Sequence, residues 1–341
     1  MNRKTWVYIC KKFAQLVLTL LVLSLVVFLV SRLAPGDPLR SFYGDAVERM
    51  STEQQEAARE RLGLNEGLLQ QYINWISGAV QGDFGISFKY KQDVLDVIGQ
   101  VWGNTFILTS ICLVLILLLG MALAVFCVSH EGELIDRAIC KIGVAVSSIP
   151  EFFAALVLVL IFSVNLGILP SGGVYSIGGG SLSDRAVHLI LPVSAIVITH
   201  LWYCAYLMRN KLSEEVRKEY VLLYRVKGVS RRRILWVHCM KNSMPAIVSM
   251  MAIFLPHLLG GAYIIEMVFS YPGLGRLGFE SAKYHDYNLL MVISLLTGAA
   301  VILANMAAQI INEKLDARME YDRTEHAEEN RNSCPGGGSF E

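Results

Sequence analysis

The sequence predicts an all-α membrane protein with six transmembrane helices. Hydrophobic residues make up 54% of the 341 residues and charged residues only 17%, whereas about a quarter of the residues are charged in soluble domains. Six apolar stretches are each long enough to cross about 30 Å of hydrocarbon as a helix that rises about 1.5 Å per residue. Because these stretches are continuously apolar, they do not fit the alternating pattern of a transmembrane barrel.

The six predicted spans follow one another along most of the chain, at residues 13–30, 105–128, 142–166, 188–208, 244–269 and 289–311. The first, second and sixth contain no charged residue. The third, fourth and fifth contain Pro150, Pro192 and Pro256. Proline removes a backbone donor, so each should kink its helix or mark its end.

The distribution of basic residues predicts that both termini are cytoplasmic. The N-terminal tail carries Arg3, Lys4, Lys11 and Lys12, and residues 209–241 carry ten Lys or Arg against three acids. Short cytoplasmic loops are enriched in such residues. The first apolar stretch has 18 residues, which exceeds the apolar core of a secretory signal, so we expect it to stay as an uncleaved span.

The pattern predicts one transmembrane domain over residues 1–320. Residues 32–103 form an external loop with short helices, in which the stretch 52–61 (TEQQEAARER) is expected to be an exposed helix capped by Ser51 or Thr52. Residues 209–243 form a cytoplasmic loop. Residues 321–341 are polar and end in a glycine-rich run, which predicts a disordered cytoplasmic tail.

The cytoplasmic loop 209–243 is the most informative segment for function. Two short helical patterns lie on either side of Gly228. The apolar residues Leu222, Leu223 and Val226 could fill a cleft of another protein, and the surrounding basic residues Arg225, Lys227 and Arg231–Arg233 could pair with an acidic rim. An alternative is that the arginines anchor the loop to anionic lipid headgroups.

Sequence motifs for catalysis are absent from this chain. It has no phosphate loop of the form G-x-x-x-x-G-K-[ST], no H-E-x-x-H and no G-x-S-x-G, so we expect it not to be an enzyme and not to hydrolyse ATP itself. No metal-ligand spacing is present, and we expect no metal or cofactor on this chain. None of the seven cysteines falls in a loop assigned outside, which argues against a disulfide-stabilised ectodomain.

A few polar residues inside the spans are candidates for a translocation path or gate, because ionisable groups within a membrane are usually functional. They are Glu151, His257 and Glu266, and Pro150 joins them as a gate candidate because it precedes Glu151 at the expected helix break. His200, which is close in sequence to Trp202, Tyr203 and Tyr206, is a further candidate for lining the path. For each of them a packed, hydrogen-bonded structural role is the competing interpretation, and Glu266 could be a partner of Arg276.

Several motifs resemble those of bacterial peptide and nickel permeases. They run in order from Arg32-Leu-Ala-Pro-Gly-Asp-Pro38, through Gly82-Asp-Phe-Gly-Ile-Ser87, Ser148-Ile-Pro150 and Gly167-Ile-Leu-Pro-Ser-Gly172, to Glu266-Met-Val-Phe-Ser-Tyr-Pro-Gly-Leu-Gly-Arg276 and Leu315-Asp-Ala-Arg318. The resemblance implies the transmembrane domain of a type I ABC importer in the bacterial plasma membrane. It also implies the partners: a second homologous permease, two cytoplasmic ATPase subunits that bind ATP and Mg, and an extracytoplasmic solute-binding protein.

In that family the basic loop couples the permease to the ATPase. The resemblance assigns this role to Glu219, Tyr220, Val221, Arg225, Lys227, Gly228, Ser230, Arg232 and Arg233. The chain departs from the family at Tyr224 and Val226, where small residues are usual, and at Leu222, where the broader importer signature has glutamate.

The substrate stays open between peptides, which we expect, and nickel or other metal chelates. A proton-coupled secondary transporter that uses Glu151 or Glu266 is a different class. It would show inverted repeats, and the sequence has no convincing one. A scaffold or receptor without transport would explain the basic loop but not the polar residues and prolines in the spans.

Overall fold

The computed structural model describes residues 3–33 and 37–315. Within these residues the chain is almost entirely helical, and the β-structure consists of one isolated bridge between Ile86 and Asp93. The predicted tail 321–341 and the Asp316-Ala317-Arg318 part of the closing motif lie outside the described residues. The all-α prediction is confirmed.

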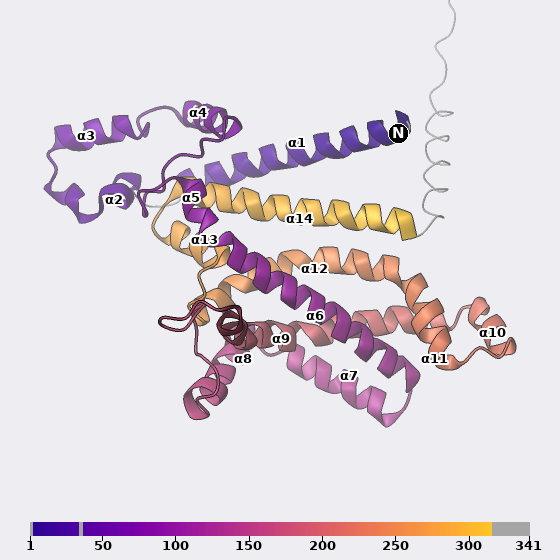
Figure 1. Cartoon of the computed structure of the whole chain (residues 1–341). Helices are drawn as coiled ribbons and strands as arrows, with labels where there is room; N and C mark the ends of the chain where they lie inside the picture. The colour runs from indigo at the N-terminus through magenta and orange to yellow at the C-terminus, as the bar shows by residue number, and fades with distance from the viewer. Residues whose placement is uncertain (1–2, 34–36, 316–341) are drawn as a thin grey trace, which may run out of the picture.

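Five long apolar helices form the body of the protein (Figure 1). They are α1 (Arg3–Leu33), α6 (Trp102–Ser129), α9 (Leu182–Val216), α12 (Met240–Val268) and α14 (Tyr287–Leu315). Four of them contain a whole predicted span, and α12 ends one residue before the predicted end at 269. Pro192 and Pro256 lie inside α9 and α12, so neither of them ends its helix.

The third predicted span is broken rather than continuous. Helix α7 (Leu134–Ser147) is followed by α8 (Glu151–Leu158) and the π-helix η2 (Val159–Asn165), and the two parts meet at an angle of 95°. Pro150 is the N-cap of α8 and has extended backbone angles at the break. Proline lacks a backbone donor and disfavours the helical region for the residue before it, so α7 does not continue through this point. The described chain therefore has five long apolar helices, or six spans if the bent pair counts as one.

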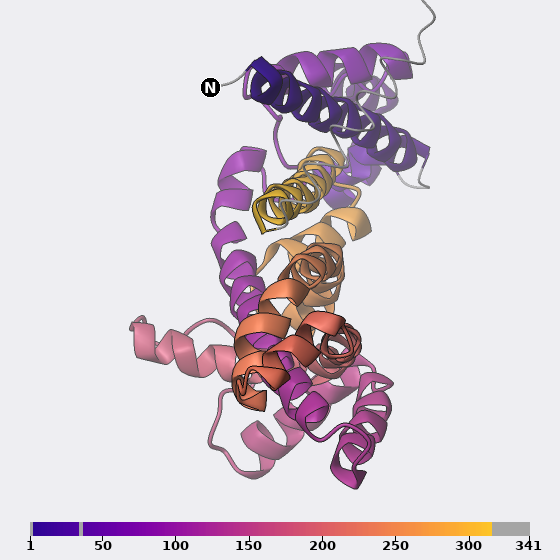
Figure 2. The same cartoon turned by 90° about the vertical axis from the view of Figure 1, so that its right-hand side faces the viewer.

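The main apolar core lies where α6, α9 and α12 meet. Ile116 of α6, Ile196 of α9 and Leu258 of α12 are among its fully buried members. Gly120 allows α6 and α9 to approach closely, since a Cβ atom there would lie 3.2 Å from the Met208 sulfur. Helices α1 and α14 pack together at one side of this core (Figure 2).

Short helices fill the segment between α1 and α6. They are α2 (Pro38–Tyr43), the 3₁₀ helix η1 (Gly44–Arg49), α3 (Thr52–Arg61), α4 (Leu68–Val80) and α5 (Val94–Gly99). Helix α3 begins at the predicted residue, and Ser51 and Gln54 form a reciprocal capping box at its start. The predicted exposed helix and its cap are confirmed.

A carboxylate network attaches this segment to α13 (Leu274–Lys283), the helix between α12 and α14. Glu280 accepts hydrogen bonds from Lys89, from the Tyr90 hydroxyl at 2.9 Å and from the Arg276 side chain at 3.0 Å. Partial burial opposes ionisation of Glu280, but these three donors outweigh it and lower its pKa to about 2. Ser87 also donates to Asp286 at the start of α14.

Candidate coupling segment and translocation path

The basic loop is mostly a continuation of the long helices. Its first part belongs to α9, which ends at Val216, and its last part enters α12 through α11 (Arg231–Arg233) and the π-helix η3 (Ile234–Cys239). Only α10 (Glu219–Val226) and its flanking turns project from the end of the helix bundle (Figure 1). Gly228 has a φ of 77°, so it makes the predicted reversal in a conformation that glycine adopts without strain.

Helix α10 presents its apolar side chains to the outside. The exposed fractions are 64% for Leu222, 53% for Leu223 and 78% for Val226, whereas Val221 on the inner side is 1% exposed. Three neighbouring apolar side chains on a charged projecting loop are costly to leave in water. In the described chain this face has no partner, so it is suited to enter a cleft of another protein.

Tyr224, one of the departures from the family pattern, points away from this face. Its ring stacks on His238 at 3.9 Å between centroids and meets the Tyr220 ring edge-on at 6.2 Å. The Tyr220 hydroxyl in turn donates to Glu215 at 2.9 Å. The large residue therefore braces α10 against η3 and does not obstruct the exposed face.

Basic side chains surround the exposed face. Arg225, Lys227 and Ser230 are exposed, and so are Arg232 and Arg233. Ser230, Arg232 and Arg233 line a shallow hollow together with Trp236. The predicted coupling residues therefore fall in two adjacent elements: residues 219–228 form the projecting α10 and its turn, and Ser230, Arg232 and Arg233 lie at the start of α11. Val221 and Tyr220 hold α10 from beneath.

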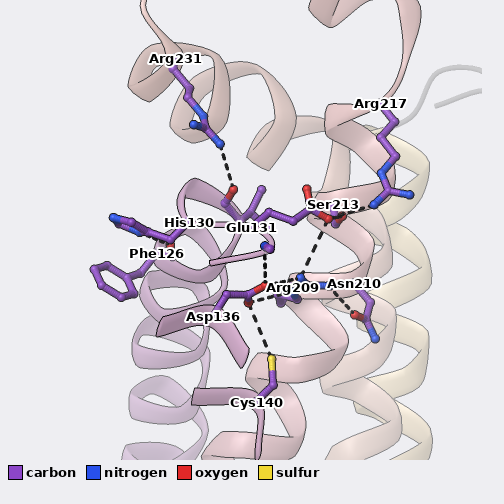
Figure 3. A network of polar contacts seen from close by, with 12 residues as sticks. Phe126, His130, Glu131, Asp136, Cys140, Arg209, Asn210, Ser213, Arg217 and Arg231 are labelled. Atoms are coloured by element: carbon purple, nitrogen blue, oxygen red, sulfur yellow. Dashed lines mark hydrogen bonds and ion pairs between the residues drawn. The ribbon is translucent and has the colours of Figure 1, made fainter. Parts of the chain in front are cut away.

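Behind α10, a polar network joins the turn between α6 and α7 to the end of α9 (Figure 3). The Arg209 guanidinium lies 2.7 Å from Asp136, a residue that is only 3% exposed. Glu131 accepts from Ser213 at 2.6 Å and from Arg217 at 2.9 Å. The Ser213 hydrogen bond and the adjacent arginines lower the pKa of Glu131. This network gives the projecting segment a fixed base.

Sequence reasoning missed this network. Arg209 and Asp136 are 73 residues apart in the chain, and Ser213 and Glu131 are 82 apart. The signal in the sequence was that this short loop, assigned to the cytoplasm, carries three acids, Glu131, Glu133 and Asp136, against Arg137 and Lys141. A further bond, from the Arg231 guanidinium to the Val128 carbonyl at 3.3 Å, ties the start of α11 to the end of α6.

Three of the candidate path residues lie around the break in the third span. Pro150 caps α8 and is exposed. Glu151 is hydrogen-bonded to His200 of α9. The His200 ring meets Phe254 of α12 edge-on at 5.1 Å, and Phe254 lies 6.1 Å from the ring of His257, which is exposed. The structure therefore joins α8 to α9 through one polar pair and α9 to α12 through one aromatic contact, and His257 lies next to that contact on α12.

Glu266 lies elsewhere, in a closed environment. It is 0% exposed and accepts hydrogen bonds from Thr105 of α6 at 2.6 Å and from the backbone N–H of Arg276 at 2.8 Å. The Arg276 side chain pairs with Glu280 instead. Glu266 thus fastens α6 and α12 to the start of α13.

Comparison with known proteins agrees with this architecture. Residues 116–321 match the family described as "Binding-protein-dependent transport system inner membrane component", and residues 6–109 match its N-terminal counterpart. The chain is 29% identical over 316 residues to the oligopeptide transport system permease protein AppB of Bacillus subtilis (strain 168), covering 92% of this chain and 99% of the relative.

A second relative is the glutathione transport system permease protein GsiC of Escherichia coli (strain K12), 32% identical over 314 residues with the same coverage of 92% and 99%. Among solved structures, a chain of the MetNI methionine ABC transporter in an inward-facing conformation matches with a TM-score of 0.53 and 18% identity, over 64% of this chain and 96% of that one. This likeness supports the predicted type I importer fold. The protein is a multi-pass membrane protein and belongs to the family of binding-protein-dependent transport system inner membrane components.

Proposed function

We propose that this chain is one of two homologous permease subunits that form the path for short peptides through the bacterial plasma membrane. Both termini lie in the cytoplasm, and residues 32–103 lie outside. An extracytoplasmic binding protein delivers the substrate, and separate ATPase subunits hold ATP and Mg. The observation that carries the proposal is the projecting α10, whose apolar face is exposed and ringed by basic side chains.

The ATPase subunit docks on α10 in this proposal. Leu222, Leu223 and Val226 enter an apolar cleft, and burying such side chains contributes about 1.5–3 kcal/mol each when they go from fully exposed to fully buried. Arg225 and Lys227 meet an acidic rim, which favours orientation and encounter. Movement of the docked segment reaches the spans through the base formed by Asp136, Arg209 and Glu131.

The translocation path passes the break in the third span. Pro150 and Glu151 lie at that break, and His200 and His257 belong to the two helices that face it. A path that must release its substrate needs only weak polar contacts, and the Glu151–His200 pair can open and close between α8 and α9. Glu266 acts at the gate indirectly, by holding α6, α12 and α13 together.

Peptides are the preferred substrate class because the curated relatives include an oligopeptide permease and a glutathione permease. Nothing in these relatives favours nickel. Specificity in such a system rests mainly with the external binding protein, so the pore itself needs little selectivity.

The test is uptake in a strain that lacks this permease, complemented with the wild-type chain. Restored uptake of a labelled tripeptide, with radiolabelled nickel uptake unchanged, is the expected result. Uptake must also stop when the phosphate-loop lysine of the partner ATPase is replaced. Restored nickel uptake without peptide uptake would contradict the proposed substrate class. Peptide uptake that does not depend on the ATPase would contradict the proposed importer mechanism.

A further inference from the structure

Helix α4 differs in character from its neighbour α3. Its sequence, LLQQYINWISGAV, contains no charged residue, whereas α3, TEQQEAARER, contains five. On a helical projection the apolar residues of α4 form one continuous face, and Gln70, Gln71, Asn74 and Ser77 form the other. A helix of this kind is expected to bury its apolar face.

Only half of that apolar face is covered by protein. Trp75 packs against Phe84 with ring centroids 6.4 Å apart, next to the cluster formed by α5, α13 and α14. The other edge is open: the exposed fractions are 72% for Leu69, 46% for Ile73 and 85% for Val80. These three side chains lie on one line along α4, because they are four and seven residues apart.

The open edge adjoins the membrane-spanning part of α1. The Tyr72 hydroxyl is 2.8 Å from that of Ser24, and the Tyr72 ring lies 5.3 Å from the Phe28 ring. Ser24 belongs to the apolar stretch Lys12–Leu33, and lies about nine residues, or roughly 13 Å, from the end of α1. The contact therefore holds α4 within the depth of the outer part of the bilayer rather than above it.

The apolar surface of α1 continues from this contact. Leu21 and Leu25 lie on the side of α1 that carries Ser24 and Phe28, and they are 45% and 42% exposed. The open edge of α4 and this side of α1 are therefore both uncharged and apolar, and the side chains of Gln70, Gln71, Asn74 and Ser77 lie on the opposite face of α4. Tyr72 and Trp75 are residue types that concentrate at the boundary between headgroups and acyl chains.

We propose that α4 is an interfacial helix that lies in the membrane surface, with Leu69, Ile73 and Val80 inserted among the lipid acyl chains. Such a helix lies in the plane of the interface with its apolar edge about 5–10 Å deep. It anchors the segment between α1 and α6 to the bilayer, so that α3 stands in water while α4 rests in lipid. The proposal concerns lipid contact alone and holds whatever substrate the permease carries.

The experiment uses the complete importer in phosphatidylcholine nanodiscs, with all native cysteines of this chain replaced and transport activity retained. Single cysteines at Leu69 and, on the polar face, at Ser77 carry an environment-sensitive fluorophore. We expect the label at position 69 to show blue-shifted emission, quenching by lipids with a spin label high on the acyl chain, and no quenching by iodide. The label at position 77 should show the opposite pattern.

A charge on either face provides a second readout. Ile73→Glu should raise the iodide quenching of the label at position 69, because the charge pulls the apolar edge out of the lipid, whereas Ser77→Glu should leave it unchanged. Equal iodide quenching at positions 69 and 77 would mean that the edge faces water and would overturn the proposal. Protection of position 69 from both quenchers would mean that protein covers this position, and this result would also overturn the proposal.

Discussion

Replacing Gly228 with valine tests the geometry of the coupling segment. Gly228 has a φ of 77°, and its N–H donates to the Arg225 carbonyl at 2.9 Å where α10 ends. A Cβ atom there would meet no other atom within 4 Å, so the cost of the substitution is backbone strain alone. A non-glycine residue in this region costs about 1–3 kcal/mol, and a β-branched residue is among the least tolerant.

That strain lowers the equilibrium constant for the docking-competent turn by about 5- to 150-fold, since about 1.4 kcal/mol corresponds to a factor of ten. We expect Gly228→Val to reach the membrane in normal amounts, and to lose peptide uptake and co-purification of the ATPase by up to a factor in that range. Both are measured on the same membranes, with the amount of permease determined by immunoblot.

Two variants serve as controls. Gly228→Asn should retain most activity, because asparagine adopts positive φ at little cost. Gly103→Ala, on α6 where an added Cβ also meets nothing within 4 Å and φ is not positive, should behave as wild type. If Gly228→Val transports normally with the ATPase bound at wild-type stoichiometry, the coupling role of this turn is refuted.

Three further predictions concern the remaining sites. Glu280→Gln should weaken the attachment of the segment before α6 to α13. The pKa of Glu280 is lowered to about 2, so its contribution in the wild type is complete above the ordinary glutamate value of about 4.5 and is lost as pH falls toward 2. Pepsin cleavage of residues 51–80 should therefore rise over that range in the wild type, and the variant should show more cleavage at pH 4.5 and a smaller rise. Glu266→Ala should leave the Thr105 hydroxyl and the Arg276 N–H unpaired, at about 1–3 kcal/mol for each unsatisfied group, and should lower the melting temperature in detergent. His200→Phe should remove the partner of Glu151 and reduce peptide uptake while ATPase binding is retained.

Each of these three predictions has a control variant and a result that would contradict it. Glu53→Gln, on the exposed face of α3, should leave pepsin sensitivity unchanged, and an unchanged acid profile in Glu280→Gln would contradict the attachment. Glu56→Ala should leave the melting temperature unchanged, and an equal temperature for Glu266→Ala would contradict its structural role. A His200→Phe variant with wild-type uptake would remove the Glu151–His200 pair from the path.

The fold was largely predictable because long apolar runs and single turn residues act locally. Four of the five long helices contain a whole predicted span, and α12 ends one residue before its predicted end. Ser51 caps α3 as predicted, and Gly228 lies between the two predicted short helical patterns. The break in the third span was harder to predict from the sequence. Pro150, Pro192 and Pro256 look alike in sequence, yet only the first separates two helices, since neighbouring packing decides whether a helix continues through a proline.

The candidate sites were predictable where their residues are contiguous, and not where they pair over long distances. The exposed face of α10 follows from eight consecutive residues. The Asp136–Arg209 and Glu131–Ser213 contacts join segments that are far apart in the chain, and a single sequence does not show which residues pair across such distances. The inward position of Tyr224 depends likewise on His238, which belongs to the next helical element.

The central claim is that the exposed face of α10 meets the ATPase. The most direct test introduces a photo-reactive amino acid at Val226, which is 78% exposed, and at Ile177, which is exposed on the loop between η2 and α9. After irradiation of intact membranes that contain the whole importer, we expect one cross-linked product between position 226 and the ATPase subunit and none from position 177. The absence of an ATPase product at position 226, or an equal product from both positions, would contradict it.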